Sequence, residues 1–164
     1  SKMDAIPDAR ASILFVCLGN ICRSPLSEGV FLHLAEAAGL ADQFEVESAG
    51  TGAWHIGERP DARSILVADK HGVALDSRAR QVTPEDFERF DYIIAMDRDN
   101  LAILQALGRE YDSDATIELL RTYEAGRDSD EVPDPYYGGA SGFENAYKMI
   151  RRSCTGLLRH LRAV

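Results

Sequence analysis

The feature that most constrains the fold of this chain is a regular alternation of short apolar runs with longer segments suited to helices. The apolar runs have the length of buried strands and lie at residues 12–16, 44–48, 92–95 and 116–119. Helices are predicted after these runs, at residues 25–38, 61–71, 98–107 and 143–161, with a short one begun at Thr83. This alternation predicts an α/β fold: a four-stranded parallel sheet with right-handed crossovers and helices on both faces.

The length and composition are those of one soluble domain. A chain of 164 residues can bury about 70% of its unfolded surface in one core. No repeat or linker divides the sequence, so we expect a single domain over residues 1–164, with residues 1–11 as a flexible N-terminal extension. No apolar run approaches the roughly 20 residues that a membrane-spanning helix needs, so we expect no membrane insertion.

Charge and cysteine content restrict the partners and the compartment. The net charge of −9 argues against nucleic acid or an anionic membrane as the main partner, although a small anion can still be held by local donors. Three cysteines are too few, and an odd number, for a secreted disulfide scaffold. We therefore expect a cytoplasmic protein whose cysteines are thiols.

The loop at residues 17–24 joins the first predicted strand to the first predicted helix, where parallel sheets bind their ligands. Gly19 and Asn20 tolerate unusual backbone angles and allow the loop to curl. Ser24 is a suitable N-cap, and Pro25 a suitable first helical residue. A curled loop at a helix N-terminus directs main-chain amides toward one point, so the loop is a candidate phosphate-binding loop.

Cys17 and Arg23 give this loop its chemistry. A planar guanidinium can bind two phosphate oxygens, and the same positive field favours ionisation of the Cys17 thiol. A thiolate hydrogen-bonded by Ser24 could then attack phosphorus. The spacing of Cys17 and Arg23 alone is weak evidence, because a buried strand-end thiol and a surface cation would show it too.

A long polar segment at residues 121–142 offers the acid that a phosphate ester needs to release its alcohol. Asp134 is followed by Pro135, which stiffens the turn, and by two tyrosines. Other acids in the segment are Asp128, Asp130 and Glu131. By composition, a solvated acidic loop is as good an interpretation as a catalytic acid.

Residues 16–25 resemble the signature loop of the low-molecular-weight protein tyrosine phosphatases. Further segments resemble that family in the same order, at residues 48–54, 79–83, 90–93, 96–101, 117–120 and 134–137. The resemblance extends from about residue 12 to residue 161, and the signature loop with the Asp-Pro-Tyr-Tyr loop is a specific pair. It implies a phosphatase that hydrolyses phosphotyrosine and small aryl phosphates through a phosphocysteine, with phosphate and other oxyanions as competitive ligands.

The resemblance also implies roles for single residues. Cys17 would be the nucleophile, Arg23 would bind phosphate and the transition state, and Asp134 would be the general acid and then the base. The implied phosphate-binding residues are Leu18, Gly19, Asn20, Ile21, Cys22, Arg23 and Ser24. Asn20, Ser24 and Ser48 would support the loop, while Trp54, Tyr136 and Tyr137 would form the walls of the substrate cleft. No metal or cofactor is implied.

Five further residues have expected roles or positions outside the catalytic set. In this family a cysteine at the position of Cys22 can form a protective disulfide with the nucleophile; the alternative is a packing residue. His55 either lies at the rim of the cleft or is exposed to solvent. At Ser77 some relatives carry a histidine of the loop-supporting network. Cys154 is expected in the core and His71 in a structural position at a helix end.

Three other functions fit the sequence less well than a phosphatase. An arsenate reductase on this fold needs additional redox cysteines and has no need of Asp134. A phosphate-binding module needs neither the thiolate of Cys17 nor the acid. A thiol-redox protein would be expected to carry two cysteines separated by two residues, unlike Cys17 and Cys22.

Overall fold

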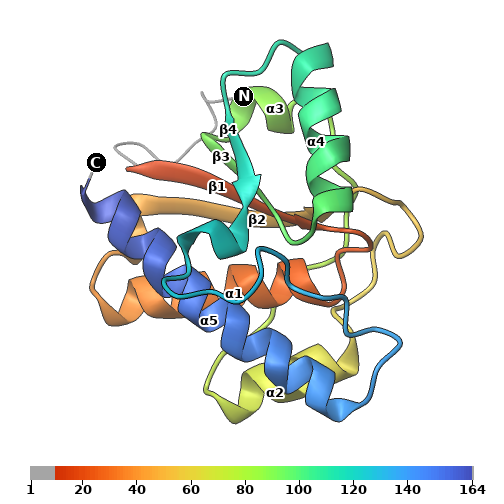
Figure 1. Cartoon of the computed structure of the whole chain (residues 1–164), viewed down its shortest axis with the longest axis vertical. Coiled ribbons are helices and arrows are strands. Elements are labelled where there is room, and N and C mark those ends of the chain that lie inside the picture. Colours follow the sequence, from red (N-terminus) through yellow and green to blue (C-terminus); the bar gives the residue numbers. More distant parts are fainter. Residues whose placement is uncertain (1–9, 164) are drawn as a thin grey trace.

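The computed structural model describes residues 10–163 and forms one α/β layer structure (Figure 1). Its strands are β1 (Ala11–Cys17), β2 (Phe44–Gly50), β3 (Tyr92–Ala95) and β4 (Thr116–Leu119). Its helices are α1 (Arg23–Ala37), α2 (Ala62–Lys70), α3 (Asp86–Arg89), α4 (Arg98–Glu110) and α5 (Ala140–Ala163), with 3₁₀ turns η2 (Ala41–Gln43) and η3 (Leu120–Tyr123). The four strands form a parallel sheet, as predicted, in the order β2-β1-β3-β4.

The sheet separates two apolar layers. Helices α1, α2 and α5 lie on one side of it, and α3 and α4 lie on the other (Figure 1). Along β1, Ile13 and Phe15 belong to the larger cluster, while Leu14 and Val16 belong to the smaller one. Successive side chains of a strand point to opposite faces, so a central strand covered on both faces has an uninterrupted apolar sequence.

The strand register brings the functional segments to one edge of the sheet. Cys17, the last residue of β1, is aligned with Gly50, the last residue of β2. On the other side, Val16 is aligned with Ala95, which ends β3. The segments that leave these strands therefore start side by side, at the carboxyl edge where parallel sheets bind ligands.

Some predicted boundaries were wrong. Helix α1 begins at Arg23 rather than Pro25, and α5 begins at Ala140, so the irregular segment before it is shorter than predicted. Ala11 is buried in β1 and does not belong to an extension; residues 1–9 lie outside the described range. Within residues 10–163, none of the helices combines the length and apolar character required to cross a bilayer.

Candidate active site

The loop at residues 18–22 turns sharply at Asn20. Asn20 has a φ of 58°, in the left-handed region that few residues other than glycine adopt. The carbonyls of Leu18 and Ile21 accept hydrogen bonds from the amides of Gly52 (2.9 Å) and Asp61 (2.7 Å). Within the described range 10–163, the amides of residues 18–22 donate no hydrogen bond. Five main-chain donors are therefore free for an anion.

A chain of buried polar groups holds the loop from behind. The Asn20 amide nitrogen donates to the hydroxyls of Ser24 (2.7 Å) and Ser48 (3.0 Å), and its carbonyl oxygen accepts from the amide of Arg80 (3.0 Å). Ser48 in turn donates to the Glu28 carboxyl (2.6 Å). Burial raises the pKa of Glu28. The side-chain bonds of Asn20 thus keep the backbone at its unfavourable φ.

Gly50 explains how β2 can approach this loop. A Cβ atom at this position would lie 2.7 Å from the Leu18 carbonyl oxygen and 3.1 Å from the Asn20 amide nitrogen. Both are main-chain atoms, which cannot move aside without distorting the loop. Only a glycine allows the end of β2 to lie directly against the curled segment.

Cys17 lies at the base of the loop, beside Ser24. Their Sγ and Oγ atoms are 3.0 Å apart, and both residues are buried. The Ser24 hydroxyl also accepts from Asn20 and lies 3.3 Å from the Ala49 carbonyl oxygen, so its single proton can be donated either to that oxygen or to the sulfur. Ser24 was predicted as the N-cap of the helix, but it is the second residue of α1, whose N-cap is Cys22 without a side-chain capping bond. The hydroxyl lies against the Cys17 sulfur instead of capping the helix.

Arg23 is oriented by groups from two segments, one after β3 and one before α5. Its side chain is 2% exposed; Nη1 lies 2.6 Å from the Asp97 carboxylate and 2.8 Å from the Val132 carbonyl oxygen. Nη2 lies 3.6 Å from the Asp134 carboxylate. The buried Nε has no hydrogen-bond partner within residues 10–163. An unpaired buried donor is costly, so Arg23 is arranged to bind an acceptor that is not part of these residues.

Asp134 is the acid of the long segment that reaches this site. Its Oδ1 atom accepts a hydrogen bond from the Tyr136 amide (3.0 Å), and its side chain remains 35% exposed. The other candidate acids are engaged elsewhere: Asp128 pairs with Arg121, while Asp130 and Glu131 contact Arg98. Of these four acids, Asp134 is the one that lies beside Arg23.

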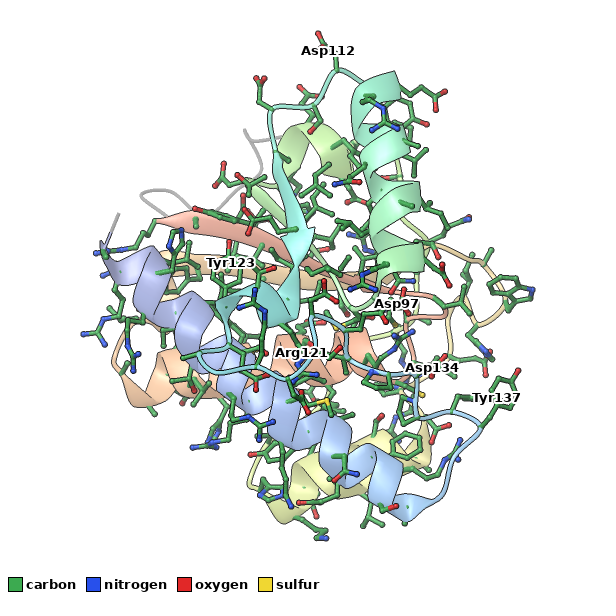
Figure 2. All side chains as sticks on the ribbon, viewed as in Figure 1. Asp97, Asp112, Arg121, Tyr123, Asp134 and Tyr137 are labelled. Carbon is green, nitrogen blue, oxygen red and sulfur yellow. The ribbon has the colours of Figure 1, made fainter. Side chains whose placement is uncertain are left out.

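These residues surround one cavity of about 400 Å³. The cavity is lined by Cys17, Leu18, Gly19, Ile21, Cys22, Arg23, Trp54, His55, Asp134, Tyr136 and Tyr137. Asn20, Ser24 and Ser48 lie behind it as buried support. Figure 2 shows Asp97 and Asp134 near each other at this end of the sheet, with Tyr137 pointing outward. The predicted catalytic, phosphate-loop and cleft residues thus come together in one place.

The rim of the cavity is aromatic and open to solvent. Trp54 is 71% exposed and Tyr137 is 93% exposed, while Tyr136 is about half as exposed as Trp54. His55 also lies at the rim, where its Nδ1 atom is 2.8 Å from the Glu58 carboxylate. The rim can accept a flat apolar group whose far end stays in water.

Helix α2 connects the phosphate-loop side to the aromatic wall. The Asp61 amide binds the Ile21 carbonyl oxygen, and the Asp61 carboxylate pairs with Arg63, whose hydrogen bond holds the pKa of that carboxyl below its ordinary value. Arg63 also donates to the Tyr136 carbonyl oxygen (3.1 Å) and lies over the rings of Tyr136 and Phe143. The wall and the loop are therefore held by the same helix end.

The environment of the Cys22 thiol opposes its ionisation. It is buried at the N-cap of α1, and burial, assisted by the charge of Asp61, raises the pKa of its thiol to about 12. Cys22 is therefore a neutral thiol at physiological pH. Free cysteines at all three positions, 17, 22 and 154, are buried.

Two carboxylates that the sequence analysis did not assign, those of Asp97 and Glu28, lie under the loop. Arg80, which also bonds to Asn20, lies in the segment 79–83 that resembles the family, but the sequence gave it no role. The Ser77 side chain makes no hydrogen bond within residues 10–163, so the network does not use it. As predicted, Cys154 is in the core and His71 is structural, stacking on Tyr147 with ring centroids 3.9 Å apart. Residues 10–163 contain no cluster of three metal-ligating side chains.

Comparisons with known proteins agree with this geometry. The family model described as "Low molecular weight phosphotyrosine protein phosphatase" matches residues 12–164. The chain belongs to this family. A low molecular weight protein-tyrosine-phosphatase of Streptomyces coelicolor is 46% identical, over 92% of this chain and 93% of that one.

Solved structures support the same assignment. A protein tyrosine phosphatase from Entamoeba histolytica superposes with a TM-score of 0.88 at 37% identity, covering 93% of this chain and 97% of that one. A Drosophila arginine phosphatase superposes with a TM-score of 0.86 at 36% identity, covering 90% and 96%. The low molecular weight phosphatase fold therefore includes proteins named for two different phosphorylated side chains.

Proposed function

We propose that this low molecular weight phosphatase hydrolyses phosphotyrosine in proteins and peptides, and small aryl phosphates, through a phosphocysteine on Cys17. The observation that carries the proposal is the set of unpaired donors around the Cys17 sulfur. Five loop amides and the buried Nε atom of Arg23 have no partner within residues 10–163. A phosphoryl group in this position would satisfy them, with Asp134 on the side open to the leaving group.

In the first step, the Cys17 thiolate attacks phosphorus and the bond to the phenolic oxygen breaks. The S–P bond forms as the P–O bond is lost, and Asp134 transfers its proton to the departing phenolate. The hydroxyl of Ser24 and the N-terminus of α1 favour the thiolate before attack. Phenol and phosphocysteine are the products of this step.

In the second step, water attacks the phosphocysteine. The Asp134 carboxylate takes a proton from the water, the new P–O bond forms and the S–P bond breaks. The leaving Cys17 thiolate again receives the hydrogen bond of Ser24. In both steps, the loop amides and Arg23 stabilise the charge on the equatorial phosphoryl oxygens, because these donors are oriented before the reaction begins.

The aromatic rim supports an aryl substrate. Trp54, Tyr136 and Tyr137 offer apolar faces, and a phenyl ring between them would place its phosphate toward the loop. A phosphoserine has no ring to contact these walls and a shorter reach. We therefore expect phosphotyrosine to be preferred, as a difference in kcat/KM.

We further propose that Cys22 protects the nucleophile during oxidation. Peroxide would convert the Cys17 thiolate to a sulfenic acid, and the Cys22 sulfur would displace hydroxide, giving a disulfide and water. Both cysteines line the same cavity, which supports the pairing. The raised pKa of Cys22 makes it a slow partner, so we expect ring closure to accelerate with pH. A Cys22→Ser protein that recovers from peroxide as well as the parent would contradict this role.

Substrate assays with purified protein test the main proposal. In the presence of a chelator, we expect release of phosphate from a phosphotyrosine peptide, with much lower kcat/KM for phosphoserine and phosphoarginine peptides of the same sequence. Cys17→Ser should abolish turnover, and Asp134→Ala should slow it by about 100-fold or more. Full activity of Cys17→Ser would contradict the role of Cys17 as nucleophile. A higher kcat/KM for phosphoarginine would show that phosphotyrosine is not the preferred substrate.

A cytoplasmic location is also proposed. Its support is chemical: all three cysteines are free thiols, and the mechanism requires Cys17 to remain reduced. Fractionation of the native host with an antibody against this chain would test the location.

A further inference from the structure

A buried cation lies far from the reacting sulfur, at the start of the segment that carries Asp134. Arg121, in η3, has a side chain that is only 2% exposed, and its guanidinium contacts groups in three directions. Nε donates to the Glu124 carboxylate (2.9 Å), Nη2 to the Asp128 carboxylate (2.6 Å) and Nη1 to the Glu131 carbonyl oxygen (2.9 Å). One side chain thus fixes three points of the segment.

The charges of this cluster are maintained at neutral pH. Burial tends to raise the pKa of Glu124, but hydrogen bonds from Arg121 and Arg152 outweigh it and lower the pKa overall. The hydrogen bond from Arg121 lowers the pKa of Asp128 as well. The buried pair at the centre of this cluster, Arg121 with Glu124, rarely stabilises a fold more than apolar side chains of the same volume would. Its distinctive effect is to impose one geometry on the segment.

That geometry is transmitted to the active site over a short stretch of chain. The residue after Glu131 is Val132, whose amide donates to the Met96 carbonyl oxygen (2.8 Å) and whose carbonyl accepts from Arg23 (2.8 Å). Asp134 follows two residues later. Arg121 is therefore connected to Asp134 by one side-chain hydrogen bond, to the Glu131 carbonyl, and by the three peptide bonds between residues 131 and 134.

The other end of this path is rigid because η3 packs directly on α5. A Cβ atom on Gly156 would lie 1.8 Å from the Tyr123 carbonyl oxygen, so only glycine allows this approach. Glu124 is also paired with Arg152 of α5 (3.0 Å). Figure 2 shows Arg121 and Tyr123 over α5, and Asp134 further along toward the carboxyl edge of the sheet. The segment that carries Arg121 is therefore held in a fixed position on α5.

We propose that Arg121 is a positioning residue for the proton transfer made by Asp134: its bond to the Glu131 carbonyl sets where the Asp134 carboxyl stands above Cys17. The inference rests on the proposed function, in which Asp134 protonates the leaving group. Arg121 itself touches neither substrate nor sulfur, and it is absent from the residues that line the cavity.

Arg121→Met tests this role, because methionine retains apolar volume but removes every donor. A misplaced general acid matters most when the departing phenol is weakly acidic. We expect kcat/KM to fall about 10-fold for phosphotyrosine but less than about 3-fold for p-nitrophenyl phosphate, whose phenol leaves without much help. The inhibition constant of inorganic phosphate should stay within about 2-fold, since the loop amides are untouched and the Asp97 carboxylate still holds Arg23.

A double variant gives a second, independent reading. Once Asp134→Asn has removed the acid, displacement of residue 134 no longer affects proton transfer. Arg121→Met combined with Asp134→Asn should therefore react with phosphotyrosine at about the rate of Asp134→Asn alone. Multiplied losses in the double variant would mean that Arg121 acts on something other than Asp134.

Arg152→Met is the matched control. Arg152 pairs with the same Glu124 carboxylate but is half exposed, and within residues 10–163 it makes no hydrogen bond or ion pair with residues 128–134, acting on Asp128 only through its charge. It should leave the ratio of the two kcat/KM values unchanged. Arg121→Lys keeps the charge without the three-way fork, so its ratio should lie between those of the parent and Arg121→Met. If Arg121→Met does not fold, Arg121→Lys carries the test alone.

The outcomes separate this inference from the function on which it rests. Equal losses on both substrates in Arg121→Met or Arg121→Lys, with folding preserved, would show a structural role only and overturn the inference. If Asp134→Asn showed the same activity as the parent on both substrates, the proposed general acid itself would be wrong. A parent protein without activity on either substrate would contradict the proposed function itself, independently of any Arg121 variant.

Discussion

The Arg23 guanidinium and the Asp97 carboxylate form a 2.6 Å ion pair beside the phosphate loop, with the arginine almost fully buried. The second oxygen of Asp97 accepts the amide of Asn100 and caps α4 (2.8 Å). One carboxylate thus orients the phosphate-binding side chain and begins the next helix. This double use connects the end of β3 to the chemistry at the end of β1.

Asp97→Asn should weaken catalysis and stability together. The asparagine oxygen can still cap α4, but the charge that faces Arg23 is lost. Because Arg23 remains bonded to the Val132 carbonyl, we expect a loss of about 2 kcal/mol in the free energy of unfolding, below the range for a fully broken buried pair. A tilted guanidinium should lower kcat/KM by about 10-fold or more. Urea unfolding and steady-state kinetics measure both effects.

Asp99→Asn is the matched control for this prediction, since Asp99 lies exposed in the same first turn of α4. Asp99→Asn should change the free energy of unfolding by no more than about 0.5 kcal/mol and should leave kcat/KM close to that of the parent. Equal effects of the two substitutions would show that the charge near the helix N-terminus matters, rather than the pair with Arg23.

Ser24→Ala should slow turnover without loosening phosphate binding. The variant removes the hydroxyl 3.0 Å from the Cys17 sulfur, while Asn20 keeps its bonds to Ser48 and Arg80, which continue to hold the loop. One hydrogen bond to a charged group contributes about 1.5–3 kcal/mol, which corresponds to a fall in kcat of roughly 10- to 150-fold. Stopped-flow kinetics should place part of the loss in the breakdown of phosphocysteine. An unchanged kcat would show that the hydroxyl only packs against the sulfur.

Glu28 should give stability a distinctive pH dependence. Burial raises the pKa of its carboxyl above the unfolded value of about 4.3. A carboxyl whose pKa is higher in the folded state favours folding while it is protonated, and that contribution is lost as pH rises through the folded pKa. Relative to the parent, Glu28→Gln should therefore gain stability as pH rises above the unfolded pKa of about 4.3.

Urea unfolding at several pH values checks the Glu28 prediction. Glu36→Gln, an exposed substitution on the same helix, serves as the reference for the general effect of removing a carboxylate. A stability difference between Glu28→Gln and the parent that stays constant with pH, or moves in favour of the parent, would contradict the raised pKa.

Local patterns predicted the sheet and the phosphate loop because their causes are local. β1 is covered on both faces, so its sequence is continuously apolar, and Asn20 reveals the curl through its tolerance of a positive φ. Cys17 and Arg23 lie at opposite ends of one short loop, and that spacing can be seen in the sequence. Their position at the edge of the sheet then follows from the alternation of strands and helices.

Contacts between distant segments could not be predicted in this way. Asn20 and Arg80 are 60 residues apart, and Arg23 and Asp97 are 74 residues apart. No periodicity links such positions. The start of α1 was mispredicted for a related reason: capping propensity favours Ser24, but its hydroxyl is already held by Asn20 and Cys17, which belong to the tertiary site.

Gly52→Ala should disturb the aromatic wall of the cleft from behind. A Cβ atom on Gly52 would lie 1.8 Å from the Trp54 ring, which must then move, because the ring is the exposed and movable partner. Loss of this wall should raise the KM for aryl phosphates by roughly 3- to 10-fold while kcat is retained, since Cys17 and Asp134 are unaffected. Trp54→Ala should give a similar change. Gly139→Ala is the control, since its Cβ would meet no atom within 4 Å. If Gly52→Ala left KM unchanged while Trp54→Ala raised it, the indole would have an alternative position from which it still contacts the substrate ring.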